Sequence, residues 1–358
     1  MQRHNTFGRQ RQVVVLRDHD SVWAPEAKAE VLEAVGAIHE GLGRMGYTVI
    51  PLQVQSPGEL ADTLKPFDPD RCVVLNLCDG IESDAVDLVQ IPALLEELGF
   101  TYTGADARTL LATQDKTCAK RVLTAHGIPT PEWSTVLGSE FKWDRYPAIV
   151  KVADEHGSEA LTPASVVHDQ RDLQARVAEL AALGKQYLMV SEFIDGRELT
   201  VSLWGNGHVR ALPLVEIDYA AYRPEWPRLR TFEAKWQTNS PLYQRARLVC
   251  SPSLSVELQS RIERIAVDAY RALNLRDYAR IDIRVRGGVP YVIDVNANPD
   301  LSAGSSFVIA AKRAGYDYGA MLGRIIEWAV QRAEARQRQV RRGGYDGYTV
   351  FDAGCCPT

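Results

Sequence analysis

The sequence predicts an α/β protein built from several lobes. Short apolar runs that are typical of buried strands alternate with segments whose apolar residues recur at helical spacing. This alternation indicates strands covered by helices, with a largely parallel first sheet. The length of 358 residues fits two or three domains or lobes. A hydrophobic content of 46% excludes a fully disordered chain, because enough apolar surface is available to offset chain entropy.

The first domain is placed at residues 1–112 and is expected to be α/β. Gly43, Gly46 and Gly99 interrupt its helical pattern and mark the places where helices give way to strands. Its expected elements, in chain order, are a strand at 13–16, a helix at 26–45, strands at 47–52 and 72–77, and a helix at 88–98.

Two further lobes and a tail are expected after it. The central lobe is placed at 113–190, with a helix at 116–126 that stops at Gly127, a strand at 148–152, a helix at 169–183 and a strand at 187–192. The C-terminal lobe is placed at 191–335, with strands at 197–204, 209–217, 280–285 and 291–295 and helices at 255–273 and 317–335. A polar, proline-rich stretch at 219–253 interrupts this lobe, and residues 336–358 are interpreted as a mobile tail.

The stretch from Arg280 to Asn296 carries the clearest chemical pattern. Two apolar strands are joined by Arg286-Gly-Gly-Val, which is short enough for an antiparallel hairpin. Because strand side chains alternate between faces, Ile281, Ile283 and Val285 are expected on one face, together with Tyr291, Ile293 and Val295 of the second strand. The opposite, polar face then holds Arg280, Asp282 and Arg284 of the first strand, with Asp294 and Asn296 of the second.

Two carboxylates and a carboxamide on rigid strands suit Mg²⁺, which prefers oxygen ligands. A neighbouring arginine would stabilise charge that develops on a transferring phosphoryl or acyl group. The same pattern fits a salt-bridged amphipathic hairpin equally well, so the hairpin alone leaves both interpretations open.

Two lysines favour a phosphate site. Lys116 stands at an expected helix start, and Lys151 lies inside an apolar strand, where an ammonium is costly to bury unless it meets an anion. The loop that follows, Asp154-Glu-His-Gly-Ser, has small residues whose backbone N–H groups can cover phosphates. The sequence has no Walker A motif and no G-x-G-x-x-G pattern, which disfavours P-loop kinases and nicotinamide dehydrogenases.

Composition limits the kinds of binding partner and the cellular compartment that we expect for this protein. With 41 Lys and Arg against 46 Asp and Glu the net charge is −5, so nucleic-acid binding is not expected. No apolar run approaches the roughly 20 residues of a membrane span, and residues 1–12 lack the apolar region of a secretory signal. The six cysteines are scattered without a C-x-x-C pair, so we expect reduced thiols in a cytoplasmic protein, with no disulfide scaffold or zinc site.

A series of motifs resembles the ATP-grasp ligases of the D-alanine–D-alanine ligase-like family. The resemblance covers roughly residues 72–333, and its specificity comes from the number and order of the motifs. In chain order they are Asn76-Leu-Cys-Asp-Gly, Ile91-Pro-Ala-Leu-Leu-Glu, Tyr102-Thr-Gly-Ala-Asp, Asp115-Lys116, Gly127-Ile-Pro-Thr-Pro, Ile149-Val-Lys-Val-Ala-Asp-Glu-His-Gly-Ser, Ser191-Glu-Phe-Ile-Asp-Gly-Arg-Glu-Leu-Thr-Val, Asp277-Tyr-Ala-Arg-Ile-Asp and Asp294-Val-Asn-Ala-Asn-Pro.

The resemblance implies an ATP-grasp fold with an N-terminal Rossmann-like pre-ATP-grasp domain, and ATP held between the other two lobes. It also assigns roles by position. The nucleotide-binding residues would be Lys116, Lys151, Glu155, Ser158, Glu192, Phe193, Ile194, Glu198 and the lid residue Lys235. Asp282, Asp294 and Asn296 would hold two Mg²⁺ ions, for which Mn²⁺ would substitute. Arg280, Lys235 and Ser305 would be catalytic.

The implied reaction joins a carboxylate to an amine through an acyl phosphate, with residues 219–253 as the lid. Small amino acids or a peptide are the implied substrates, and a homodimer is the implied assembly. Several positions depart from the pattern of D-alanine ligases, which indicates a product other than D-alanyl-D-alanine. No equivalent of the glutamate that binds the first ammonium can be placed in Arg17-Asp-His-Asp-Ser-Val-Trp, and the other departures are Gly157, Ser191, Trp236 and Asp300.

Two alternatives to a ligase remain open at this stage. One is ATP-dependent phosphoryl transfer to a small carboxylic acid without amide formation. The other is a non-catalytic ATP-binding protein that serves a partner.

Overall fold

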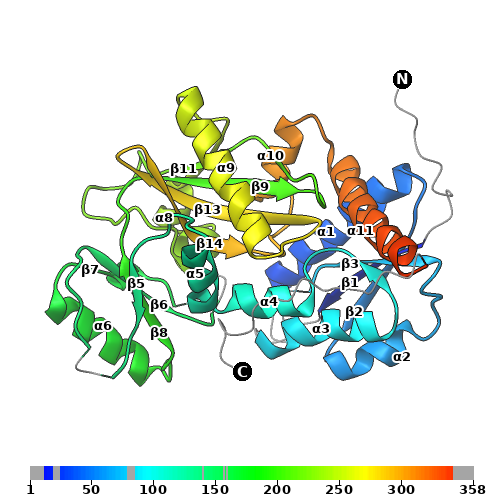
Figure 1. Ribbon diagram of the computed structural model, residues 1–358, viewed down its shortest axis with the longest axis horizontal. Coiled ribbons are helices and arrows are strands. Elements are labelled where there is room, and N and C mark those ends of the chain that lie inside the picture. Colours follow the sequence, from blue (N-terminus) through cyan, green and yellow to red (C-terminus); the bar gives the residue numbers. More distant parts are fainter. Residues whose placement is uncertain are drawn as a thin grey trace.

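The computed structural model describes residues 12–18, 25–78, 85–138, 141–155, 158 and 160–341. Three sheets divide these residues into an N-terminal, a central and a C-terminal part (Figure 1). In the view of Figure 1 the N-terminal lobe lies at the right, the central lobe at the lower left and the C-terminal lobe above. None of the helices in these ranges is long and apolar enough to span a membrane.

The N-terminal lobe contains a four-stranded parallel sheet in the order β2-β1-β3-β4. Val13 and Val15 pack against one layer of helices, whereas Val14 and Leu16 pack against the other. Both faces are therefore buried, which explains why residues 13–16 form a continuous apolar run. The elements are β1 (Gln12–Asp18), α1 (Pro25–Arg44), β2 (Thr48–Val54), the 3₁₀ helix η1 (Pro57–Glu59), α2 (Leu60–Leu64), β3 (Cys72–Asn76), α3 (Ala85–Glu97), β4 (Thr101–Tyr102) and α4 (Ala107–Gln114).

The central lobe contains a four-stranded antiparallel sheet in the order β5-β8-β6-β7. Leu173 and Leu180 of helix α6 pack against the buried side of this sheet. The elements are α5 (Lys116–Ala125), β5 (Trp133–Thr135), β6 (Ala148–Val152), the 3₁₀ helix η3 (Pro163–Ser165), β7 (Val166–Val167), α6 (Gln170–Ala182) and β8 (Leu188–Glu192).

The C-terminal lobe contains a six-stranded sheet in the order β12-β11-β9-β13-β14, with β10 paired to β9. Helix α9 covers its apolar face through Ile262, Ile265 and Ala269. Helix α11 packs instead against α1 of the N-terminal lobe (Figure 1). The elements are β9 (Arg197–Trp204), β10 (Arg210–Ala211), β11 (Val215–Asp218), α7 (Phe232–Trp236), α8 (Pro241–Arg245), β12 (Arg247–Cys250), α9 (Val256–Ala272), β13 (Tyr278–Arg286), β14 (Val289–Asn296), α10 (Ser306–Arg313) and α11 (Tyr318–Arg341).

The structure corrects the sequence analysis at several places. The strand expected at 209–217 is two strands, β10 and β11, and the segment expected to be a lid includes α7, α8 and β12. Helix α11 runs to Arg341, past residue 336 where the tail was expected to begin, and residues 342–358 lie outside the described residues.

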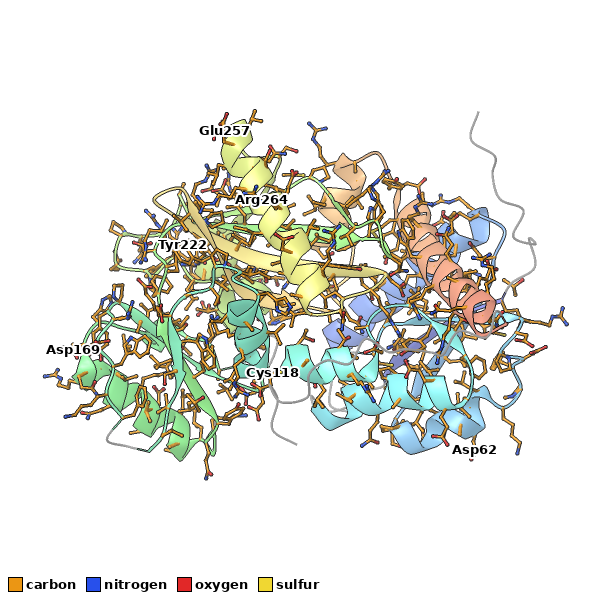
Figure 2. The ribbon with its side chains drawn as sticks, viewed as in Figure 1. Asp62, Cys118, Asp169, Tyr222, Glu257 and Arg264 are labelled. Atoms are coloured by element: carbon orange, nitrogen blue, oxygen red, sulfur yellow. The ribbon has the colours of Figure 1, made fainter. Side chains whose placement is uncertain are left out.

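The cysteines also differ from expectation. Cys72, Cys78 and Cys250 are free thiols, as expected. Cys118 of α5, labelled in Figure 2, is disulfide-bonded, so the expectation of reduced thiols is wrong for this residue.

A buried carboxylate joins the N-terminal and C-terminal lobes. Asp277, the residue before β13, has no exposed surface and accepts hydrogen bonds from the Gly104 backbone N–H (3.0 Å) and the Asn206 side chain (2.8 Å). Arg332 of α11 forms an ion pair with it at 2.9 Å and also donates to the Tyr102 carbonyl oxygen. The 102–106 motif and Asp277, the first residue of the 277–282 motif, therefore meet at a lobe contact, whereas Arg280 and Asp282 of the latter motif line the cavity described below.

We expect Asp277→Ala to lower the free energy of unfolding by about 3–5 kcal/mol, because the change leaves the Arg332 guanidinium without its carboxylate. Denaturant titration followed by circular dichroism measures this loss. Glu327→Ala is the matched control, since the Arg324–Glu327 pair has side chains 37% and 44% exposed. Its loss should stay below about 1 kcal/mol. Equal losses in the two variants would contradict a buried lobe contact at Asp277.

Candidate functional site

A cavity lies between the central and C-terminal lobes, and residues from 116 to 296 line it. Thirteen of the fourteen site residues predicted from the sequence are among those lining residues: Lys116, Lys151, Glu155, Ser158, Glu192, Phe193, Ile194, Glu198, Lys235, Arg280, Asp282, Asp294 and Asn296. The exception is Ser305, whose hydroxyl caps α10 by accepting a hydrogen bond from the Val308 backbone N–H at 3.4 Å.

The hairpin of β13 and β14 forms one wall of this cavity. Gly287 and Gly288 make its two-residue turn, with φ values of 57° and 76°, a conformation that glycine adopts without strain. Asp282 lies directly opposite Asp294 in the register, and Arg280 lies opposite Asn296. The predicted hairpin and the predicted polar face are thus confirmed.

The apolar face of β14 was predicted incorrectly. The register shifts next to Asp282, where Ile281 pairs with Val295 but Ile283 pairs with Val292, so β14 has one extra residue. This bulge places Val292 in the core at 1% exposure and turns Ile293 into the cavity. A bulge reverses the alternation of faces along its strand, and a pattern of period two cannot anticipate it.

The polar face is held together by hydrogen bonds. The Arg280 guanidinium donates to both carboxylate oxygens of Asp282, from Nε to Oδ1 at 2.8 Å and from Nη2 to Oδ2 at 3.0 Å. The Asn296 amide donates to Oδ2 of the same carboxylate at 3.2 Å. Asp282 therefore has a fixed orientation, set from both strands of the hairpin.

The donor set fits a magnesium ion. Asp282, Asp294 and Asn296 offer oxygen ligands, which Mg²⁺ prefers. Thr200 of β9 pairs with Asp282 in the register, and its buried hydroxyl has no hydrogen-bond partner among the described residues. The described ranges contain no group of three or more His, Cys, Asp and Glu side chains that could hold a metal ion. A metal here would therefore depend on the Asn296 oxygen and on waters or phosphate oxygens, as is common for Mg²⁺.

Lysines line the opposite wall. The Lys116 ammonium donates to the carbonyl oxygen of Glu155, and its backbone N–H donates to Ala153 at 2.9 Å. Burial lowers the pKa of Lys116, and the Asp294 carboxylate partly opposes that shift. The Glu155 side chain forms an ion pair with Lys185, while its Oε2 is buried without a partner in the described chain. His156, which the sequence places in the phosphate loop, lies outside the described residues.

A buried ion pair between Arg284 and Glu198 also lines the cavity. Arg284 of β13 donates from Nε to Oε2 of Glu198 at 3.0 Å, and Tyr219 donates to the same oxygen at 2.9 Å. Arg284 also donates to the Ile194 carbonyl oxygen at 3.0 Å and lies 4.7 Å from the Phe193 ring centroid. Arg284 thus fixes both the segment between β8 and β9, through Ile194, and the Glu198 carboxylate of β9.

Lys235 reaches the cavity from helix α7 in the segment 219–253. Its ammonium lies 4.8 Å from the Trp236 ring centroid. Burial, with a contribution from the Arg280 charge, lowers the pKa of Lys235 to about 8. Tyr222, labelled in Figure 2, ties the segment internally by donating to the Leu242 carbonyl oxygen at 3.1 Å.

A second cavity lies on the side of the N-terminal lobe. Its lining includes Arg17, Asn76, Asn298, Asp300 and Ser302. The Asp300 carboxylate accepts hydrogen bonds from the backbone N–H of Ser302 (2.7 Å) and from its hydroxyl (2.9 Å).

Comparison with known proteins identifies the family. The family model described as D-ala D-ala ligase C-terminus matches residues 122–327. A D-alanine–D-alanine ligase from Ralstonia nicotianae is 31% identical over 270 residues, which cover 71% of this chain and 77% of the relative. The chain belongs to the D-alanine–D-alanine ligase family. It is therefore an ATP-dependent ligase that forms C–N bonds, in a family that generally uses Mg²⁺ and acts on small molecules.

Other relatives of this ligase family differ in what is known of them. An uncharacterized protein from Sinorhizobium fredii, y4sG, is 35% identical over 263 residues, covering 73% of this chain and 75% of the relative. The D-alanine–D-alanine ligase from Coxiella burnetii shares the fold, with a TM-score of 0.70 at 20% identity over 93% of this chain and 98% of that one. The comparisons thus establish the ATP-grasp ligase and leave its substrates to be proposed.

Several residues that line the cavity between the central and C-terminal lobes, called the ATP-grasp cavity below, were not predicted from the sequence. Lys120 follows Lys116 by four residues, a spacing that places both on one helix face, so it could have been found. Thr200 shares a strand face with Glu198, which is also a readable signal, and Arg284 was placed on the polar face but given no role in the cavity. Arg230 comes from the segment 219–253 and has no such signal.

Proposed function

We propose that this protein joins the carboxylate of one small amino acid or peptide to the amine of another, through an acyl phosphate, with substrates other than two D-alanines. The observation that carries the proposal is one cavity lined by Lys116 and Lys151 of the central lobe and by Arg280, Asp282 and Asp294 of the C-terminal lobe. Buried cations complement the phosphate oxygens of ATP, and the carboxylate oxygens in the same cavity would suit a Mg²⁺ ion.

The first step forms the acyl phosphate. A carboxylate oxygen of the first substrate attacks the γ-phosphorus of ATP, and the bond from that phosphorus to the β–γ bridging oxygen breaks, so that ADP leaves. Lys116, Lys151 and Lys235 hold the phosphate oxygens in place for this displacement. Asp282, Asp294 and Asn296 would hold Mg²⁺, as two ions or with Mn²⁺ in its place, which would supply positive charge beside those oxygens.

The second step forms the amide. The amine nitrogen of the second substrate attacks the acyl carbon, phosphate leaves with its bonding electrons, and the nitrogen loses a proton. Arg280 stabilises the oxyanion of the tetrahedral intermediate, for which its guanidinium is preorganised by Asp282. Closure of residues 219–253 keeps water from the acyl phosphate and brings Lys235 against it.

The second cavity supports an amino-acid substrate. Arg17 and Asp300 offer opposite charges on its walls, which match the carboxylate and ammonium of a zwitterion. Asp300 and Trp236 stand where D-alanine ligases carry glycine and tyrosine. The exposed Trp236 ring adds a large aromatic surface on the segment that closes over the substrate. These differences favour a substrate pair other than two D-alanines.

We extend the proposal to the architecture. The lobes at 1–112, 113–190 and 191–335 of one chain would close together on one ATP molecule. Two such chains would form a homodimer. Ser305, the N-cap residue of α10, would lie near the carboxylate of the second, amine-donating substrate.

Product analysis tests the function. Purified full-length protein with ATP and Mg²⁺ is given pairs from a panel of amino acids, phosphate release is measured, and mass spectrometry identifies the product. We expect release only with a matching pair, and a product whose mass is the sum of both substrates less one water. A phosphorylated acid as the stable product would establish phosphoryl transfer instead. Turnover with D-alanine alone as fast as with any pair would overturn the substrate proposal.

A further inference from the structure

Lys120 lies one helical turn beyond Lys116 on α5 and lines the same cavity as Lys116 and Lys151. Its side chain is deeply buried, with 5% of the residue exposed. In the described part of the chain its ammonium makes one hydrogen bond, to the Thr130 hydroxyl at 2.7 Å, and no ion pair. That hydroxyl donates in turn to the Val292 carbonyl oxygen at 2.9 Å. An ammonium has three N–H donors, so two of them are left for something outside these residues.

The charges around Lys120 make this arrangement unfavourable without an anion. Burial, together with the Lys151 charge on β6, lowers the pKa of Lys120 to about 7. The Asp294 carboxylate on β14 opposes the shift, and Lys116 on the same helix adds a further cation to the cluster. A substantial fraction of Lys120 is therefore neutral near pH 7.5, and a polyanion entering the cavity would restore its charge.

We propose that Lys120 is a third lysine ligand of the ATP phosphates, and that it takes up a proton when the nucleotide binds. The inference rests on the proposed ATP cavity. A purely structural Lys120 would keep its single bond to Thr130 and would not change its protonation on binding. Proton uptake therefore separates a phosphate ligand from a structural lysine.

The sign of the pH dependence follows from linkage. Bound phosphate raises the pKa of Lys120, so binding is coupled to protonation between the free and bound pKa values. Below pH 7 Lys120 is already protonated, so it should make no contribution to the pH dependence of nucleotide affinity. Above pH 7 the affinity of the wild type should fall by up to about tenfold per pH unit, which is the limit for one coupled proton.

Isothermal titration calorimetry with the β,γ-imido analogue of ATP and Mg²⁺ tests the proposal on the full chain. Titrations at pH 7.5 in two buffers of different ionisation enthalpy give the number of protons taken up. The nucleotide, Lys116 and Lys235 contribute to every titration, so the readout is the difference between the wild type and each variant. We expect Lys120→Met to take up roughly 0.5–0.8 proton less than the wild type and to bind roughly tenfold to a hundredfold more weakly at pH 6.5.

Two further variants make the result specific. Lys120→Arg keeps a permanent charge, so it should bind well at high pH but show the same loss of proton uptake as Lys120→Met. Lys312→Met on α10, whose side chain is exposed, should match the wild type in both quantities. Unchanged affinity and proton uptake in Lys120→Met, with a wild type that binds nucleotide, would overturn the role of Lys120 alone. A wild type that binds no nucleotide would overturn the ATP cavity as well.

Discussion

Asp294→Asn should lower Mg²⁺-dependent turnover by about 10²–10³-fold, because a metal ion contributes several kcal/mol of transition-state stabilisation and each 1.36 kcal/mol is tenfold in rate. Asp294 lies directly opposite Asp282 on the hairpin, and both line the cavity with Asn296. The asparagine keeps the shape of the side chain and one oxygen but removes the charge. Turnover measured over a range of Mg²⁺ concentrations should therefore show a raised half-saturation as well as a lower maximum.

Asp268→Asn is the matched control for this experiment. Asp268 lies on α9 with an exposed side chain, so the same change of charge should leave turnover and Mg²⁺ dependence as in the wild type. Circular dichroism and melting temperature confirm that both variants are folded. A wild-type Mg²⁺ dependence in Asp294→Asn would show that the metal is held elsewhere.

The N-terminal sheet and the hairpin of β13 and β14 could be predicted because each has an unambiguous local signal. Residues 13–16 are apolar without alternation, as expected for a parallel strand that is buried on both faces. The pair Gly287 and Gly288 fixes a two-residue turn. Helices α7 and α8 were missed because each has only five residues, too few for a helical period to show.

Site residues that belong to a local sequence motif could be predicted. Site residues that are brought together only by tertiary structure could not. Lys151 and Asp282 stand in patterns that depend on neighbouring residues in the sequence. Arg284 was placed on the polar face, but its partners Glu198 and Tyr219 come from other strands, and no local pattern reports that pairing. Ile293 enters the cavity only because of a bulge whose position depends on how β14 pairs with β13.

Arg280 and Asp282 should act as one catalytic unit. Arg280→Met is expected to lower kcat by about 10²–10³-fold, the typical effect of losing a donor that stabilises an oxyanion. Because the guanidinium contacts both oxygens of Asp282, Asp282→Asn should misplace Arg280 in addition to weakening the metal site. The double variant should then lose little more than the worse single variant, since residues that act together are strongly non-additive.

A second pair in the same sheet supplies the control cycle. Arg197 and Glu216 also form a two-bond arginine–carboxylate pair, with both distances 2.7 Å, but neither residue lines the ATP-grasp cavity. Arg197→Met, Glu216→Gln and their double variant should retain wild-type kcat, with any change confined to thermal stability. Additive losses in the Arg280 and Asp282 cycle would mean that the arginine stabilises the reaction independently of the carboxylate. In that case the hydrogen bonds between them would serve only to hold the hairpin face in place before the substrates arrive.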